Sequence, residues 1–264
     1  MSGRTVIVTG ASSGIGEATA RAFSRAGDRV VMAARRVDRL NSLAAELPDS
    51  LVVPADLTKR EDIARVAEAT LARYGTIDVL VNNAGLWRYD WLERLSGDDI
   101  LVQLGTNLTA PILLTQAVLP AMQAKGRGVI INVCSVAGKI GVPTLSIYNA
   151  TKFGLDGFSE AMRRELRPQG IDVCVIYPGG VAGTESSAHT RGATIGATTP
   201  PWLRQTADGV AQVIVGLADR PRTRRVLPGI LGAAIALNAL LPSVVDRVLM
   251  RVARRARGRS SGVH

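Results

Sequence analysis

Short apolar runs alternate with longer helical patterns along most of the chain, and this rhythm constrains the fold more than any other feature. The apolar runs cover residues 5–8, 29–33, 51–54, 78–81, 128–134, 172–177 and 225–227, and the helical patterns cover residues 14–26, 37–46, 60–74, 98–125 and 148–166. Strands separated by helices favour a parallel sheet with helices on both faces, and strands buried on both faces are apolar throughout. Ligands bind such a sheet beyond the carboxyl ends of its strands. The sequence therefore predicts an α/β fold with a doubly wound parallel sheet and a ligand site at that edge.

The length and composition fit one large domain. The chain has 264 residues, of which 47% are hydrophobic and 20% charged, as in ordinary globular proteins. We expect one domain with its ligand loops over residues 1–228, and a C-terminal extension over residues 229–264. Cys134 and Cys174 lie in apolar runs and are expected to be buried thiols. The first strand begins too early to leave room for a signal peptide, so a cytoplasmic protein is expected.

A glycine-rich segment lies directly between the first predicted strand and the first predicted helix. It reads Thr9-Gly10-Ala11-Ser12-Ser13-Gly14-Ile15-Gly16. Gly10 allows a tight turn, Gly14 lets a pyrophosphate approach the backbone and Gly16 allows close helix packing, while the helix N-terminus offers free N–H donors. The weaker alternative is a glycine turn without a ligand. We predict that Gly10, Ser12, Ser13, Gly14, Ile15 and Gly16 bind the phosphates of a dinucleotide.

The end of the second predicted strand distinguishes NAD from NADP. NAD is usually held there by an acidic residue that binds the ribose hydroxyls. This chain instead has Arg35 and Arg36, whose guanidinium groups suit the additional 2′-phosphate of NADP. The alternative is that both arginines only solvate the strand end. We predict that the cofactor is NADP(H).

A tyrosine and a lysine lie one helical turn apart in the predicted helix 148–166. Tyr148 and Lys152 therefore leave the same face of the helix. A tyrosine alone titrates at a pKa of about 10, and a nearby ammonium is expected to lower that pKa toward the range useful for acid–base catalysis. Ser135 follows the fifth strand at the same edge, where its hydroxyl can hold a substrate oxygen. Alone, such a pair is more often a solvated helix face.

Together, these motifs resemble those of the short-chain dehydrogenase/reductase family from Thr5 to about Thr184. The matching elements, in order, are Thr9-Gly10-x-x-x-Gly14-x-Gly16, Asp56, Asn82-Asn83-Ala84-Gly85, Asn107, Ser135, Tyr148-x-x-x-Lys152 and Pro178-Gly179. The resemblance implies a Rossmann-like sheet of about seven strands. It also implies a homodimer or homotetramer packed through the long helices around Asn107 and Tyr148.

The resemblance assigns roles to the matching residues. Tyr148 would be the catalytic acid or base, Ser135 would position the carbonyl group, Lys152 would contact the nicotinamide ribose and tune Tyr148, and Asn107 would hold a water that links Lys152 to solvent. The cofactor would also contact Asp56, Leu57, Asn83, Ala84, Gly85, Pro178, Gly179, Val181 and Thr184. The segment Gly180 to Thr184 carries one residue more than the family pattern.

The loops expected to surround the substrate are mostly apolar and aromatic. They cover residues 86–91, 136–146 and 180–202, and we place Trp87 and Val136 beside the substrate with Ser135 and Tyr148. This lining favours a hydrophobic alcohol or ketone. Equally, Trp87, Trp91 and Trp202 could only pack the loops. No metal is expected, because His189 and His264 lie far apart without ligand spacing.

The expected activity is NADP(H)-dependent hydride transfer between nicotinamide and a carbonyl or secondary alcohol carbon. One alternative is a dehydratase or epimerase of the same fold that retains NADP without net turnover. The other is a cofactor-sensing or nucleic-acid-binding module, which would leave the set Asn107, Ser135, Tyr148 and Lys152 unexplained. We expect no nucleic-acid partner.

The net charge of +10 is concentrated in the tail. Ten arginines and two aspartates follow Ala218, so this tail carries +8. The apolar stretch 226–241 reaches 16 residues, fewer than the ~20 that span a bilayer. Beyond it, a basic amphipathic helix is typical of segments that lie on anionic membranes. A helix that closes the pocket or contacts another subunit is an equal alternative.

Overall fold

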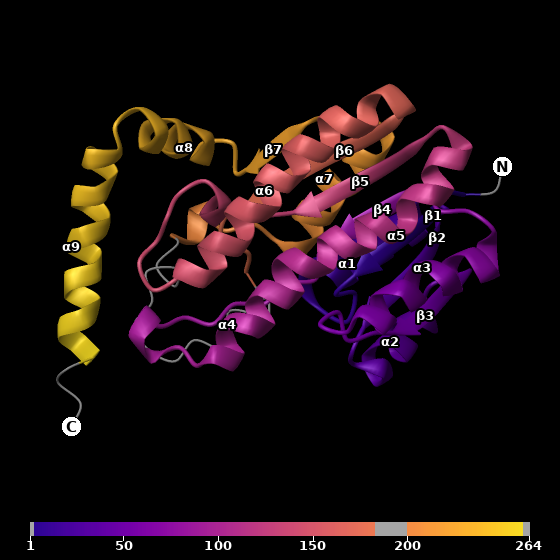
Figure 1. Ribbon diagram of the computed structural model, residues 1–264, viewed down its shortest axis with the longest axis horizontal. Helices are drawn as coiled ribbons and strands as arrows, with labels where there is room; N and C mark the ends of the chain where they lie inside the picture. Colours follow the sequence, from indigo (N-terminus) through magenta and orange to yellow (C-terminus); the bar gives the residue numbers. More distant parts are fainter. Residues whose placement is uncertain (1–2, 183–199, 261–264) are drawn as a thin grey trace.

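Seven parallel strands form one sheet in the computed structural model, which describes residues 3–182 and 200–260. The strand order is β3-β2-β1-β4-β5-β6-β7 (Figure 1). The strands are β1 (Thr5–Thr9), β2 (Arg29–Ala34), β3 (Ser50–Pro54), β4 (Val79–Asn82), β5 (Gly128–Val133), β6 (Ile171–Pro178) and β7 (Arg224–Leu227). The order reverses beside β1, so the crevice between the loops that follow β1 and β4 lies at the carboxyl edge of the sheet. The predicted fold class is confirmed.

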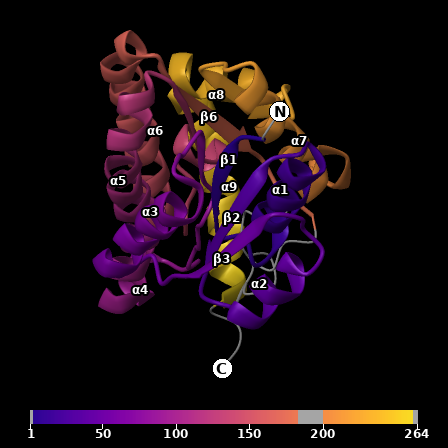
Figure 2. The same cartoon turned by 90° about the vertical axis from the view of Figure 1, so that its right-hand side faces the viewer.

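Helices cover both faces of the sheet, and Figure 2 shows the sheet between the two layers. One layer contains α1 (Gly14–Arg25), α2 (Val37–Ala44) and α7 (Ala207–Asp219). The other contains α3 (Arg60–Tyr74), α4 (Gly97–Leu104), α5 (Ala110–Lys125) and α6 (Ser146–Leu166). This arrangement explains the apolar runs of the sequence, because every central strand is buried on both sides.

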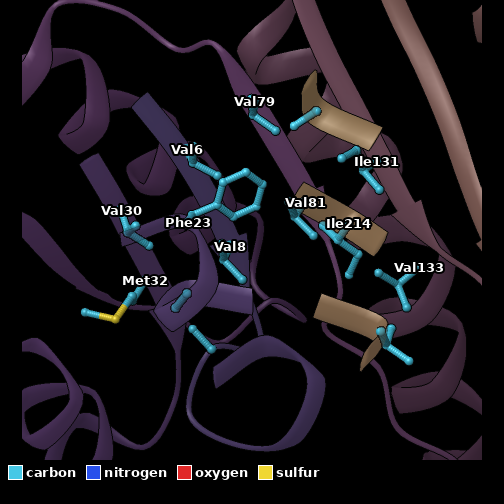
Figure 3. Packing of buried hydrophobic residues seen from close by; sticks show 14 of the residues in the cluster. Val6, Val8, Phe23, Val30, Met32, Val79, Val81, Ile131, Val133 and Ile214 are labelled. Carbon is cyan, nitrogen blue, oxygen red and sulfur yellow. The ribbon is translucent and has the colours of Figure 1, made fainter. Parts of the chain in front are cut away.

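Two apolar clusters, one on each face, hold the helices to the sheet. Neighbouring residues of a strand point to opposite faces, so Val6 and Val8 join one cluster while Ile7 joins the other. Figure 3 shows the first cluster, in which Phe23 of α1 and Ile214 of α7 lie against the strands. The sequence analysis assigned no element to residues 207–219, yet α7 completes this layer.

The predicted long helix 98–125 is interrupted. It consists of α4, a π-helical segment (Gly105–Thr109) and α5. A π segment adds a residue to one turn, and such segments are frequent at functional sites. Here the segment contains Asn107, which is completely buried. The prediction of one regular helix was therefore wrong at the segment Gly105–Thr109.

The tail forms two helices, α8 (Leu231–Leu240) and α9 (Pro242–Ser260), at the end of the molecule opposite α2 and β3 (Figure 1). Among the described residues, no single helix is long and apolar enough to cross a membrane. The pair formed by residues 231–240 and 242–254 meets the length and composition needed for a broken span, and the two helices meet at 112°.

Candidate functional site

The glycine-rich loop forms a cradle between β1 and α1. Gly10 has a φ of +67° and Gly14 a φ of +57°, a region of backbone conformation that residues other than glycine rarely adopt. Ser13, the N-cap of α1, makes no side-chain cap hydrogen bond, which leaves the first N–H groups of the helix to another acceptor. The cradle therefore fits an anionic pyrophosphate group at the helix N-terminus.

Gly16 packs too closely for any side chain. A Cβ atom at this position would lie 2.2 Å from the carbonyl oxygen of Gly10 and 2.6 Å from Nδ2 of Asn83. We expect Gly16→Ala to lower the free energy of unfolding by about 1–3 kcal/mol, since the backbone of the loop must shift. Thermal unfolding checks this prediction, because each kcal/mol of lost stability lowers Tm by about 2–4 °C in a domain of this size.

Gly216→Ala in α7 is the matched control for this substitution. A Cβ atom at Gly216 would meet no atom within 4 Å. The control should raise the free energy of unfolding by about 0.5–1 kcal/mol, because alanine loses less backbone entropy in a helix. A Gly16→Ala variant as stable as Gly216→Ala would contradict the tight packing of the loop.

The two arginines after β2 reach different parts of the cradle. Arg36 donates hydrogen bonds from Nε and Nη2 to the hydroxyl of Ser12, at 3.1 and 3.0 Å, and from Nη2 to the hydroxyl of Ser13 at 2.6 Å. Arg35 instead acts on Asp56, on the loop after β3. Burial acts to raise the pKa of this carboxyl group, but hydrogen bonds from Thr58 and the charge of Arg35 lower it overall.

Several residues predicted to contact the cofactor lie on the loops after β3 and β4. Asp56 accepts hydrogen bonds from the backbone and hydroxyl of Thr58, while Leu57 is buried in the core. Asn83 donates from Nδ2 to the carbonyl oxygen of Thr9 at 2.9 Å, which ties the loop after β4 to the end of β1. The loop after β4 therefore borders the cradle, close to Gly10 and Gly16.

Tyr148 and Lys152 lie one turn apart on α6, and both are buried. The Nζ atom of Lys152 is 5.7 Å from the centre of the Tyr148 ring and donates a hydrogen bond to the carbonyl oxygen of Val133 at 2.9 Å. Ser135 follows β5, and its side chain lies close enough to that of Tyr148 to lower the pKa of the phenol. The structure thus brings the three predicted catalytic residues together.

Burial determines the protonation of this group. Desolvation raises the pKa of Tyr148 well above its usual value, and the side chain of Ser135 only partly offsets this effect. Desolvation also lowers the pKa of Lys152. The expected lowering of the Tyr148 pKa by the ammonium of Lys152 was wrong. Burial of the phenol determines the direction of the shift, and Lys152 is not among the groups that change this pKa.

Asn107 joins α6, the helix of the predicted catalytic residues Tyr148 and Lys152, to the loop after β4. Its Oδ1 accepts a hydrogen bond from the backbone N–H of Leu86 at 2.8 Å, and its Nδ2 donates to the carbonyl oxygen of Leu86 at 2.7 Å and to Thr151 at 3.3 Å. The predicted role was to hold a water for Lys152. The observed contacts show that Asn107 fixes the backbone beside Trp87 directly.

Aromatic and apolar side chains pack around Tyr148. The Trp87 ring lies edge-to-face with Tyr148 at 5.7 Å and with Tyr89 at 5.8 Å. The same cluster contains Ala137, Val142 and Leu145. Val136, predicted to contact substrate, is half-buried and packs against the cluster of Cys134, Val175 and Tyr177. Of the three tryptophans, Trp87 alone lies beside Tyr148, whereas Trp91 contacts Arg257 of α9 and Trp202 is exposed.

A second polar group lies behind the site, and the sequence analysis missed it. Asp156, one turn after Lys152, forms an ion pair with Lys139 and accepts a hydrogen bond from the hydroxyl of Tyr177. Lys139 belongs to the loop that carries Ser135, so this pair ties that loop to the catalytic helix. The four-residue spacing of Tyr148, Lys152 and Asp156 was the sequence signal that could have indicated this group.

Part of the predicted cofactor contact lies outside the described residues. Pro178 ends β6, Gly179 donates to the carbonyl oxygen of Leu227 at 2.7 Å, and Val181 pairs with Gln205 as an isolated bridge. Thr184, like His189 and His264, belongs to the part that the structure does not describe. Within residues 3–182 and 200–260, no group of His, Cys, Asp and Glu side chains could hold a metal ion.

The comparison with known proteins identifies the family. The sequence pattern of the short chain dehydrogenases matches residues 4–194, which is more than half of the chain. The chain belongs to this family. It is therefore a member of a family of oxidoreductases that bind a nicotinamide cofactor, and the resemblance predicted from the motifs is confirmed.

Relatives of this short-chain dehydrogenase cover almost the whole chain. A dehydrogenase/reductase SDR family protein 7-like of Anopheles gambiae is 32% identical over 275 aligned residues, which cover 97% of this chain and 84% of that protein. A short-chain dehydrogenase from Streptomyces avermitilis superimposes with a TM-score of 0.81 at 31% identity, covering 96% of this chain and 98% of the other. A metagenomic short-chain oxidoreductase solved in complex with NADP has a TM-score of 0.71 and 33% identity, covering 86% and 96% of the two chains.

Proposed function

We propose that this short-chain dehydrogenase uses NADP(H) to interconvert a carbonyl group and an alcohol on a hydrophobic small molecule. The observation that carries the proposal is the buried Tyr148 hydroxyl, whose pKa is affected by the neighbouring Ser135 side chain and which lies one helical turn from Lys152. This group lies at the edge of the sheet where the cradle of Gly10 to Gly16 begins α1. Proton transfer and dinucleotide binding thus converge on one side of the sheet.

The polar residues each have a part in the proposed reaction. Because burial keeps the phenol of Tyr148 protonated, this residue is ready to donate a proton to a carbonyl oxygen that gains negative charge. The hydroxyl of Ser135 would donate a second hydrogen bond to the same oxygen, which is electrostatic stabilisation of the forming charge. Bound nicotinamide would supply the hydride, or accept it in the opposite direction. Asn107 and the pair of Asp156 and Lys139 hold the surrounding segments in place.

The preference for NADP rests on Arg35 and Arg36. The guanidinium group of Arg36 lies over Ser12 and Ser13, and the end of β2 carries no acidic residue. A guanidinium group binds phosphate oxygens with paired, charge-assisted hydrogen bonds. The similar metagenomic oxidoreductase in complex with NADP also supports this choice.

The hydrophobic substrate follows from the residues that surround Tyr148. Trp87, Tyr89, Val142 and Leu145 form an apolar cluster with it. Burial raises the pKa of Tyr89 to about 12, so its ring is also uncharged at neutral pH. The Nε1 atom of Trp87 is buried without a hydrogen-bond partner among the described residues. A substrate with an apolar body and a second oxygen acceptor would satisfy this donor.

The first experiment is NADPH and NADH oxidation, followed by absorbance, against a panel of hydrophobic ketones, aldehydes and quinones. We expect turnover with NADPH on at least one hydrophobic ketone, and slower turnover with NADH. The reverse assay with the matching alcohols and NADP tests oxidation. Tight binding of NADPH without turnover of any carbonyl or alcohol compound would contradict the proposal and favour a non-redox reaction on the same fold.

A further inference from the structure

The face of α8 that points away from the molecule is apolar. Exposed fractions are 63% for Ile230, 42% for Leu237, 79% for Leu240 and 52% for Leu241. Positions 230, 237 and 240 recur at helical spacing, so these side chains lie along one side of the helix. The chain contains no charged residue between Arg225 and Asp246. An exposed apolar stripe of this kind is typical of a surface that binds a partner or a membrane.

The apolar stripe continues onto α9 and is followed there by arginines. The half-buried residues of this helix are Val245, Leu249, Val252 and Ala253. Val244 and Val248 are exposed and recur four residues apart, and Arg251 follows on the same side one turn later. Arg247 and Arg254 are also exposed. The apolar residues thus lie around the elbow, where α8 ends at Leu240 and α9 begins at Pro242. The positive charge follows further along α9.

The tail also contacts both loops that border the catalytic site. Asn238 of α8 donates a hydrogen bond to the carbonyl oxygen of Lys139 at 3.2 Å, in the loop that carries Ser135. Arg257 of α9 forms an ion pair with Glu93 at 2.9 Å and lies 4.6 Å from the ring of Trp91, in the loop that carries Trp87. α8 near the elbow and the C-terminal end of α9 are therefore each held against one of these loops.

We propose that the elbow of α8 and α9 docks on the surface of a membrane that contains anionic phospholipids. Leucines that enter the acyl boundary beside arginines that contact headgroups are the combination that binds amphipathic helices to such surfaces. The charge favours a lipid surface over a second copy of this chain, since two α9 helices would bring arginines together. Resting on the proposed function, this docking places the Tyr148 site next to a source of lipophilic ketone or alcohol.

Cosedimentation with vesicles tests the docking without any need for turnover. The full chain is mixed at low salt with vesicles of phosphatidylcholine, with or without phosphatidylglycerol. We expect binding only to the anionic vesicles, and release at high salt because salt screens the arginines. Arg251→Gln combined with Arg254→Gln should lower the partition coefficient roughly fivefold for each arginine.

One further variant and two controls separate the docking surface from general effects of charge and hydrophobicity on vesicle binding. Leu240→Gln combined with Leu241→Gln should weaken binding while leaving Tm and the turnover of a water-soluble ketone unchanged. The matched controls are Arg25→Gln combined with Arg60→Gln, which removes two exposed arginines elsewhere, and Leu101→Gln, which removes an exposed leucine of α4. Both controls should bind the vesicles like the unchanged protein. Equal losses in the controls would overturn the proposal.

Other results identify a different occupant and would also overturn the proposal. A dimer that Leu240→Gln converts to a monomer, without vesicle binding, would assign the surface to a second copy. Resistance to extraction with alkaline carbonate would show that α8 and α9 insert into the bilayer. If DNA added at a charge equal to that of the vesicles displaced the protein from them, the arginines would be assigned to nucleic acid. Failure of turnover alone, with vesicle binding intact, would refute only the proposed reaction.

Discussion

Replacement of Tyr148 by phenylalanine is expected to lower kcat for carbonyl reduction by about 10²–10⁴-fold, because the substrate oxygen loses its proton donor. The ring of Tyr148 packs against Trp87, and phenylalanine keeps that packing. We therefore expect little change in Tm and in the affinity for NADPH. Steady-state kinetics, cofactor titration and thermal unfolding measure the three quantities on the same preparation.

The control for this substitution is Tyr74→Phe. Tyr74 lies at the end of α3, where its hydroxyl donates to the carbonyl oxygen of Asp49, and it has no contact with the catalytic group. This variant should keep full activity. If Tyr148→Phe also kept more than about a tenth of the activity, Tyr148 would not be the general acid, since loss of such a group costs at least about 10²-fold.

Replacement of Arg36 by alanine is expected to lower kcat/KM for NADPH by about 10–100-fold, while kcat/KM for NADH changes little. The physical reason is the loss of charge-assisted hydrogen bonds to the 2′-phosphate, each worth about 1.5–3 kcal/mol. NADH lacks that phosphate and cannot lose the interaction. The ratio of the two kcat/KM values is therefore the decisive quantity.

The control for the cofactor prediction is Arg25→Ala. Arg25 is the last residue of α1 and is exposed, at the opposite end of that helix from the cradle. Its replacement by alanine removes the same charge as Arg36→Ala. This variant should leave both kcat/KM values unchanged. A parallel loss with both cofactors in Arg36→Ala would mean that Arg36 only shapes the loop through Ser12 and Ser13.

Local patterns were sufficient to locate the cradle and the catalytic pair. Gly10 follows β1, and Gly14 and Gly16 lie in the first turn of α1. Tyr148 and Lys152 are separated by one helical turn, so short-range geometry fixes their relation. The carboxyl ends of parallel strands meet at one edge, which places Ser135 with them. The apolar runs predicted the strands because each lies between two helical layers.

Helical periodicity was insufficient at two elements. The π segment around Asn107 leaves the surrounding pattern helical, so the sequence does not reveal the additional residue in the turn. In α7, Val210, Ile214 and Leu217 recur at helical spacing but stand among other apolar residues, and a short apolar segment of this kind does not distinguish helix from strand. Packing against Phe23 of α1 resolves that ambiguity in the fold.

The sequence by itself determined the seven strands, most of the helices between them, the cradle and the residues able to transfer a proton, because these depend on neighbours a few positions apart. Only the tertiary structure decided that Trp87 meets Tyr148, that Asp156 binds Lys139 and Tyr177, and that burial raises the pKa of Tyr148. Such contacts join distant segments, and their geometry and hydration depend on how the whole chain packs.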